Sequence, residues 1–232
     1  AVKDTRADNG QVIILEAKTG RVLAMSHYPS FDPNNYSEVF EREIINLTKE
    51  EEAHLKLMNE KSGEYSLILN NETGEQLRVF KEISQDGKAI YKKYKNRIGP
   101  EAYQNKLVAW EYEPGSVFKT IAMATAIDDK DITPQTIYHD TGPVKTDEYE
   151  IKNATGQYFG AITMQTVLEK SLNTGMTFVA RKIGRNLFYN YIKKFGFGEK
   201  SDIEFDDEAA GKIKPYTQWA ESELITYTFG QG

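Results

Sequence analysis

The pattern of apolar and polar residues divides the chain into three regions. In residues 10–26, two short apolar runs, Val12–Leu15 and Val22–Met25, flank the turn-forming residues Lys18–Gly20. Two apolar runs joined by a short turn are typical of a β-hairpin. We therefore expect an antiparallel hairpin, followed by a loop at Tyr28–Ser37, where two prolines and two asparagines interrupt the pattern.

The middle region, from about residue 38 to residue 104, is dense in charged side chains. The stretch "TKEEEAHLKLMNEK" has helical spacing, whereas "EYSLILN", "LRVFKEIS" and "KAIYKKYK" are typical of strands. We expect a helix plus a small sheet, inserted into a larger domain. The charged helix is most simply a solvated face, and a partner-docking role is the alternative.

After Pro114 the chain becomes helical. A buried helix of small residues is expected to begin near Ser116. A second helix fits "TMQTVLEKS", with Thr163 as its N-cap, and a third runs from about Thr174 to Phe195, where "FGFG" supplies glycines for the C-terminal cap. A hairpin, a small sheet and several helices together predict the α+β class.

Composition excludes several classes of protein. The chain has 232 residues, of which 39% are hydrophobic and 28% are charged, so it can bury a real core. A net charge of −6 argues against a nucleic-acid-binding surface, which is usually basic. The absence of cysteine excludes disulfides and thiolate chemistry. No apolar run approaches the ~20 residues that a membrane span needs.

The first candidate for chemistry is the stretch "EPGSVFKT", in which Ser116 precedes Lys119 by one helical turn on the same face. A lysine held beside a serine in an apolar site loses hydration, so its pKa falls and it can accept the serine proton. The pair is therefore a candidate nucleophile and general base. Taken alone, Ser116 is more simply a helix cap.

The second candidate is "KSLNTG", between two predicted helices. The Ser171 hydroxyl can relay a proton to a leaving group, and the Asn173 amide can bind both the lysine and a substrate amide. Taken alone, these two residues are also explained as caps. The two motifs together favour a catalytic site.

Several stretches together carry a family resemblance. "YEPGSVFKT" and "SLNTG", with "AKTGRVLAM", "YPSFDPN", "FGFGEKS" and the terminal "TFGQG", resemble the transpeptidase domain of class B penicillin-binding proteins, the peptidoglycan D,D-transpeptidases. The resemblance implies the penicillin-binding protein/serine β-lactamase-like fold, with an antiparallel sheet flanked by helices and a mainly helical subdomain. We expect residues 1–232 to be a partial transpeptidase domain, incomplete at its C-terminus, with an insertion at about 38–104.

The resemblance also implies a role for each candidate residue. Ser116 is the acylated nucleophile, Lys119 is its general base, and Ser171 and Asn173 form the second motif. The implied partners are peptidoglycan stem peptides ending in D-Ala-D-Ala, β-lactams and other cell-wall synthesis proteins, with no metal or organic cofactor. The intact protein is expected to be anchored by a preceding N-terminal segment at the extracytoplasmic face of the bacterial inner membrane.

The third motif of the family, Lys-Thr/Ser-Gly on a strand, is expected after the second motif. The "KTG" at Lys18–Gly20 precedes the nucleophile and lies in the predicted hairpin turn, so it is expected to be a solvated turn. The sequence ends at Gly232, before the expected position of the third motif. Because loss of one oxyanion-hole donor lowers a rate by ~10²–10³, these residues alone are expected to be weakly active or inactive.

Two alternatives to a transpeptidase stay open. A serine β-lactamase shares the Ser-x-x-Lys core but needs a further base that activates water. A β-lactam sensor or a scaffold without enzymatic activity would bind partners through residues 38–104.

Overall fold

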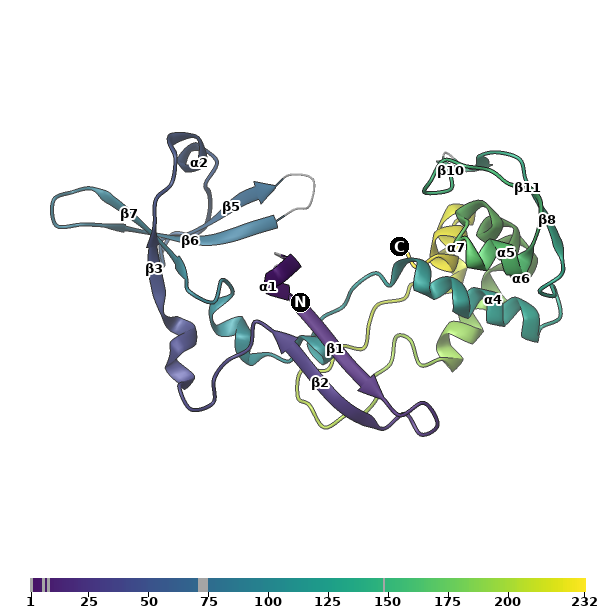
Figure 1. Ribbon diagram of the computed structural model, residues 1–232, viewed down its shortest axis with the longest axis horizontal. Coiled ribbons are helices and arrows are strands. Elements are labelled where there is room, and N and C mark those ends of the chain that lie inside the picture. Colours follow the sequence, from purple (N-terminus) through teal and green to yellow (C-terminus); the bar gives the residue numbers. More distant parts are fainter. Residues whose placement is uncertain (1, 6, 8, 71–74, 148) are drawn as a thin grey trace. The chain divides into compact units, whose positions relative to one another are not determined.

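The computed structural model describes residues 2–5, 7, 9–70, 75–147 and 149–232. The chain forms two compact units, residues 1–110 and residues 111–232 (Figure 1). Each unit has a buried apolar cluster of its own. Among the described residues, no helix combines the length and the apolar character that crossing a bilayer requires.

The first unit begins with the short helix α1 (Val2–Thr5) and the predicted hairpin, which is confirmed. Strands β1 (Gly10–Leu15) and β2 (Val22–Tyr28) pair antiparallel. The apolar side chains of the hairpin are largely exposed, including Val12 at 60%. The "KTG" residues lie in the exposed turn, as predicted, where the Gly20 N–H donates to the Glu16 carbonyl at 2.9 Å.

The middle region forms a five-stranded antiparallel sheet in the order β3-β7-β6-β5-β4. Its strands are β3 (Arg42–Ile45), β4 (Lys56–Asn59), β5 (Glu64–Asn70), β6 (Glu75–Ile83) and β7 (Ala89–Tyr94). The three strands predicted from the sequence are confirmed, and β3 and β4 were missed. That the region is an insertion into a larger domain stays a prediction.

The prediction of a helix through "TKEEEAHLKLMNEK" is wrong beyond its first part. Helix α2 covers only Lys49–Ala53, and a capping box at Thr48 starts it. The chain then enters β4, where Lys56 pairs with Ser66 of β5. Pairing with a neighbouring strand overrides helix propensity, which is a weak preference.

The remaining elements of the first unit are short. Two 3₁₀ turns, η1 (Tyr36–Phe40) and η2 (Gly99–Tyr103), flank the sheet in sequence, and helix α3 (Lys106–Ala109) ends the unit. The rings of Tyr36 and Tyr103 stack with their centroids 4.1 Å apart. This contact joins η1 to η2.

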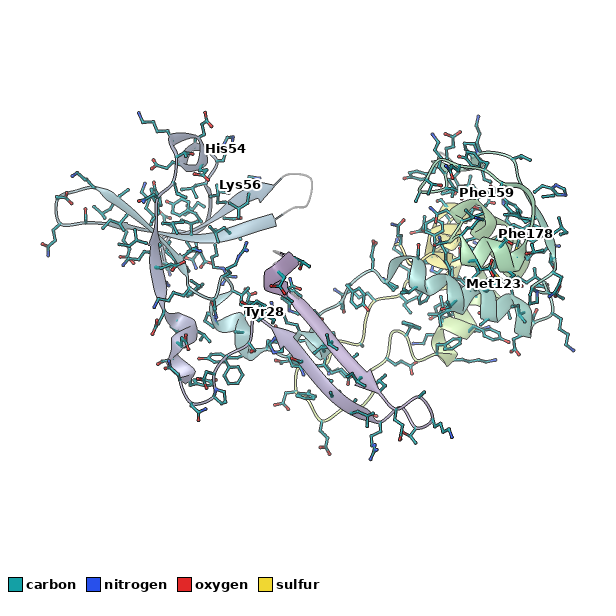
Figure 2. The ribbon with its side chains drawn as sticks, in the orientation of Figure 1. Tyr28, His54, Lys56, Met123, Phe159 and Phe178 are labelled. Carbon is teal, nitrogen blue, oxygen red and sulfur yellow. The ribbon has the colours of Figure 1, made fainter. Side chains whose placement is uncertain are left out.

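The second unit is mainly helical, as predicted. It contains η3 (Gly115–Phe118), α4 (Lys119–Asp128), α5 (Met164–Glu169), α6 (Asn173–Lys194), η4 (Tyr216–Gln218) and α7 (Glu221–Thr228). Figure 2 labels Met123 of α4, which is part of the buried cluster of this unit, and Phe178 of α6, which packs against that cluster. Phe118 and Ala122 are in the same cluster, so the start of α4 packs against the core.

The predicted helix ends are confirmed, but the third helix is not continuous, because Gly184 inside α6 has φ 65° and ψ 165° and interrupts the helical backbone. The Thr163 hydroxyl accepts a hydrogen bond from the Thr166 N–H at 3.2 Å and caps α5. Helix α6 ends where the Gly196 and Phe197 N–H groups donate to carbonyls of the last turn, at 2.9 and 3.2 Å. Gly196 has φ +86°, the left-handed conformation that this C-terminal cap requires.

Two small antiparallel ladders lie between α4 and α5 in sequence, and neither was predicted from the sequence. Strand β8 (Ile137–Asp140) pairs with β11 (Gly160–Thr163), and β9 (Val144–Thr146) pairs with β10 (Tyr149–Ile151). Figure 1 shows them beside the helices of the second unit. Every strand pair of the described residues is antiparallel, and the chain has the mixed α and β architecture that the sequence predicts.

Candidate active site

The structure brings together the four residues that the sequence singled out. Ser116 lies in η3 and Lys119 is the first residue of α4, one turn later. Ser171 lies in the junction between α5 and α6, and Asn173 is the first residue of α6. All four belong to the second unit, so the site is built within one compact body.

Lys119 forms the centre of the site. Its side chain is buried, with 1% of the residue exposed. Its Nζ donates to the Ser171 carbonyl at 2.7 Å, to the Asn173 Oδ1 at 2.7 Å and to the Ser171 Oγ at 3.0 Å. These three neutral oxygens hold the amine at the junction of α5 and α6.

The environment of Lys119 makes the charged amine less stable than it is in water. Burial lowers the pKa of Lys119 from its ordinary value of 10.5 to about 8. Burial acts this way because a charged amine loses hydration that neutral oxygens only partly replace. At neutral pH a useful fraction of the amine is uncharged, which is what a general base requires.

Ser171 has an unusual backbone. Its φ is +55°, and its N–H donates to the Leu168 carbonyl at 3.0 Å, while the Leu172 N–H donates to the Val167 carbonyl at 3.0 Å. These two bonds form the C-terminal cap of α5, in which the left-handed position is usually glycine. A serine at that position turns its carbonyl and its hydroxyl toward Lys119.

The Asn173 amide is used at both ends. Its Oδ1 accepts from Lys119, and its Nδ2 donates to the Lys152 carbonyl at 3.0 Å. From the sequence, this amide is expected to bind both the lysine and a substrate amide. In this structure one Nδ2 hydrogen is taken by the chain itself, which leaves the other for a ligand.

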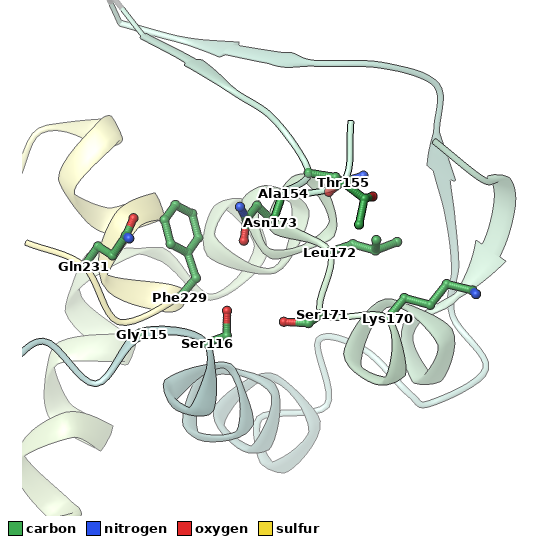
Figure 3. Close-up of a pocket in the computed structure, with 11 residues that line it drawn as sticks. Gly115, Ser116, Ala154, Thr155, Lys170, Ser171, Leu172, Asn173, Phe229 and Gln231 are labelled. Atoms are coloured by element: carbon green, nitrogen blue, oxygen red, sulfur yellow. The ribbon is translucent and has the colours of Figure 1, made fainter. Parts of the chain in front are cut away.

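Ser116 faces an open pocket. The pocket has a volume of about 260 Å³ and is lined by Gly115, Ser116, Asn153, Ala154, Thr155, Lys170, Ser171, Leu172, Asn173, Phe229 and Gln231. Figure 3 shows the Ser171 hydroxyl pointing toward Ser116, whose own hydroxyl points toward the side of the pocket where Phe229 and Asn173 lie. The hydrogen bonds of Lys119 go to Ser171 and Asn173 rather than to Ser116, and catalytic hydrogen bonds often tighten only with substrate bound.

The segment after α7 closes one side of the pocket. The Gly115 N–H donates to the Gly230 carbonyl at 2.9 Å, which ties this segment to the turn that carries Ser116. A Cβ at Gly230 would lie 2.2 Å from the Gly115 carbonyl oxygen, and Gly230 has φ +76°. Only glycine fits at this close approach. The Gly232 N–H also donates to the Glu113 carboxylate at 2.9 Å.

Sequence reasoning missed three buried polar residues behind the pocket wall: Asp140, Asn153 and Thr174. They hydrogen-bond to one another, and Asn153 also lines the pocket. The one signal in the sequence was Thr174, which directly follows Asn173 in "SLNTG". Among the described residues, no group of three or more His, Asp and Glu side chains could hold a metal ion.

Comparisons with known proteins identify the family of the chain. A family model, the penicillin binding protein transpeptidase domain, matches residues 10–232. Stage V sporulation protein D of Bacillus subtilis is 31% identical over 137 residues, which cover 58% of this chain and 21% of that protein. Peptidoglycan D,D-transpeptidase FtsI of Escherichia coli K12 is 22% identical over 232 residues, 100% of this chain and 29% of that protein. The chain therefore spans less than a third of the length of these relatives.

Solved structures show the same fold. Penicillin binding protein 3 from Mycobacterium tuberculosis, complexed with aztreonam, matches with a TM-score of 0.66 and 22% identity, covering 100% of this chain and 39% of that one. A peptidoglycan glycosyltransferase from Burkholderia ambifaria matches with a TM-score of 0.66 and 21% identity, covering 100% of this chain and 50% of that one. The chain is thus similar to these proteins over its whole length.

Proposed function

Because the chain belongs to the penicillin binding protein transpeptidase domain family, we propose that the intact protein is a serine-type peptidoglycan D,D-transpeptidase. The observation that carries this proposal is the buried Lys119 amine, which is held by Ser171 and Asn173 one turn after Ser116. An amine with a pKa of about 8 beside an exposed serine matches the needs of acyl transfer. The substrates are stem peptides that end in D-Ala-D-Ala.

The first half of the reaction forms an acyl-serine ester. The Ser116 Oγ attacks the carbonyl carbon of the penultimate D-Ala, and neutral Lys119 takes the hydroxyl proton. The carbon–nitrogen bond to the terminal D-Ala then breaks. That proton returns from Lys119 through the Ser171 hydroxyl, 3.0 Å from Nζ, to the departing nitrogen, which leaves as an amine.

The second half transfers the acyl group to another stem peptide. An amine of that peptide attacks the ester carbonyl, its proton passes to Lys119, and Ser116 is released with its hydroxyl restored. The result is a new amide bond between two peptides. β-Lactams acylate Ser116 in the same way, and the opened ring stays attached, so the ester persists. One relative was solved in complex with aztreonam, which is consistent with this chemistry.

The substrate also suggests where the protein works. Stem peptides are cross-linked outside the cytoplasm, so we place the intact protein at the extracytoplasmic face of the inner membrane, anchored through a segment outside residues 1–232. Other cell-wall synthesis proteins are its expected partners.

The experiment that tests this function labels the intact protein with a fluorescent penicillin. We expect a label that lasts for many minutes in the wild type and is absent from Ser116→Ala. Thr120→Ala is the matched control, since Thr120 lies on α4, carries a hydroxyl that donates to the Val117 carbonyl at 2.8 Å, and does not line the pocket. It should label normally.

The same samples separate the alternatives. We expect the wild type to form amide bonds between synthetic stem peptides, with Ser116→Ala inactive. Rapid hydrolysis of penicillin would identify a β-lactamase and reject the transpeptidase. Stable labelling without any cross-linking would identify a sensor, and persistent label on Ser116→Ala would remove that serine from its proposed role.

A further inference from the structure

Three side chains behind the pocket form a closed polar cluster: Asp140 at the end of β8, Asn153 after β10, and Thr174 in the first turn of α6. Their exposed fractions are 0%, 4% and 0%. The Thr174 hydroxyl donates to the Asp140 Oδ1 at 2.7 Å, and the Asn153 Nδ2 donates to the Asp140 Oδ2 at 3.1 Å. The cluster thus joins three segments that are distant in sequence.

The Asp140 carboxylate organises this cluster. Besides Asn153 and Thr174, it accepts a hydrogen bond from the Phe159 N–H at 3.1 Å. A buried carboxylate is tolerated only where donors replace its lost water. Each of the three donors is therefore held in a fixed direction, because moving any of them would leave a buried charge partly unsatisfied.

The cluster lies directly behind the Asn173 amide. Thr174 follows Asn173 in sequence, and Asn153 follows Lys152. Two hydrogen bonds join these neighbouring pairs: Asn173 Nδ2 to the Lys152 carbonyl at 3.0 Å, and the Thr174 N–H to the Asn153 Oδ1 at 3.2 Å. The residue before α6, Leu172, makes no side-chain cap bond, so Asn153 caps this helix from another segment.

These bonds determine which end of the Asn173 amide faces Lys119. An amide can rotate by half a turn, which would point its NH₂ group at the lysine instead of its oxygen. The Lys152 carbonyl holds the Nδ2 on the opposite side, so the Oδ1 lies 2.7 Å from the lysine Nζ. A displaced Lys152 carbonyl would remove this preference.

We propose that Asp140, Asn153 and Thr174 are positioning residues that fix the Asn173 amide, and through it the Lys119 amine, for the reaction at Ser116. The effect of these residues on catalysis rests on the transpeptidase function proposed above. Their effect on the position of Lys119 does not rest on it, because that effect follows from hydrogen bonds within the chain.

The groups around Lys119 make its titration a direct readout. Its amine faces neutral groups: Ser171 and Asn173 at the junction of α5 and α6, and the Phe229 ring, whose centroid lies 5.9 Å from the Nζ. Among the described residues, the titratable groups at the cluster are Asp140 and Tyr138 of β8, and the Arg181 guanidinium of α6 also acts on Tyr138, whose pKa is raised mainly by burial. A change at the cluster therefore reaches Lys119 through Asn173 rather than through a shared ion pair.

The test compares Thr174→Val with Thr174→Ser in the intact protein. Valine removes the hydroxyl and keeps the shape, whereas serine keeps the hydroxyl. Thr125→Val is the matched control, because Thr125 of α4 has 0% exposure and its hydroxyl donates within its own helix, to the Ile121 carbonyl at 2.9 Å. Should Thr174→Val not fold, Thr174→Ala removes the same hydroxyl without placing a second methyl group against Asp140.

Two measurements are made on the folded protein. The titration midpoint of Lys119 is followed by NMR with ¹³C-labelled lysine, and its signal is assigned by its loss in Lys119→Met. The rate of acylation by penicillin is followed separately. For Thr174→Val we expect acylation to slow by about tenfold or more and the midpoint to fall by roughly half a unit, because the protonated amine loses an oriented acceptor.

The outcomes separate this inference from the proposed function. Recovery of both values in Thr174→Ser and no change in Thr125→Val support a positioning role. A Lys119 midpoint and an acylation rate that stay unchanged in Thr174→Val would overturn it, even if the protein is a transpeptidase. If the wild type is never acylated but the midpoint still falls in Thr174→Val, the positioning role stands and the transpeptidase function fails.

Discussion

The Lys119 amine lies 3.0 Å from the Ser171 hydroxyl oxygen and 2.7 Å from the Ser171 carbonyl oxygen, across 52 positions of sequence. The first residue of α4 is thereby fastened to the cap of α5. The three oxygen acceptors of the amine are all neutral groups of Ser171 and Asn173. The site is therefore arranged to hold an amine that changes charge near neutral pH.

Removing this amine should abolish most of the acylation. Lys119→Met keeps a side chain of similar length, and we expect the acylation rate with penicillin to fall by about 10²–10⁴-fold, the usual contribution of a general base. In the wild type the rate should rise with pH and level off above about 8, since only the neutral amine accepts the serine proton. A wild-type rate that is flat across this range would contradict a basic role for Lys119.

Lys119 should also make stability depend on pH. Its pKa is about 8 in the folded chain, against about 10.4 in the unfolded chain, so the unfolded state binds more protons between these values. The free energy of unfolding should therefore rise with pH from about 8 to about 10. Urea unfolding of the wild type and of Lys119→Met measures this rise as a difference. Parallel pH curves would show that folding does not lower the pKa of Lys119.

The left-handed backbone of Ser171 should lower the stability of the fold, while its hydroxyl serves acylation through the contact with Lys119. Ser171→Gly and Ser171→Ala both remove the hydroxyl that contacts Lys119, but only glycine adopts φ +55° without steric cost. We expect both variants to lose acylation to a similar extent. We also expect the free energy of unfolding of Ser171→Gly to be about 1 kcal/mol higher than that of Ser171→Ala, because this is the usual cost of a left-handed backbone at a residue other than glycine. Equal stability of the two would show that the backbone is relaxed at this position.

Gly230 lies so close to Gly115 that a side chain at position 230 should not fit. In Gly230→Ala the new methyl group would lie 2.2 Å from the Gly115 carbonyl oxygen. We expect a loss of about 1–3 kcal/mol in unfolding free energy and slower acylation, because the turn that carries Ser116 must move.

Gly211→Ala is the control for this variant. Gly211 has φ +80°, but its nearest neighbour would lie 3.8 Å from an added Cβ. It carries the left-handed cost of about 1 kcal/mol without the clash. If Gly230→Ala loses no more unfolding free energy than Gly211→Ala and is acylated at the normal rate, the contact between Gly230 and Gly115 does not position the turn that carries Ser116.

The sequence could predict those parts of the site that depend on short spacing. Ser116 and Lys119 share a helix face because they lie one turn apart, and Ser171, at the cap of α5, lies two positions before Asn173. These relationships follow from the geometry of a helix and its ends. That the two motifs meet came from the family resemblance rather than from spacing, since no local rule relates positions 119 and 171.

The buried cluster could not be predicted in this way. Thr174 and Asp140 are 34 positions apart, and Asp140 ends a strand of four residues. Such a strand has too few residues for an apolar pattern. The wrong helix over β4 has a related cause, because "KLMN" becomes a strand only through its pairing with β5.

The central claim is that the Ser116 hydroxyl becomes acylated with Lys119 as its base. The most direct measurement is mass spectrometry of peptides from the intact protein after treatment with penicillin. The account predicts one adduct, on the peptide that contains Ser116, formed faster as the pH rises through about 8. An adduct on any other residue, or undiminished adduct formation in Ser116→Ala, would contradict it.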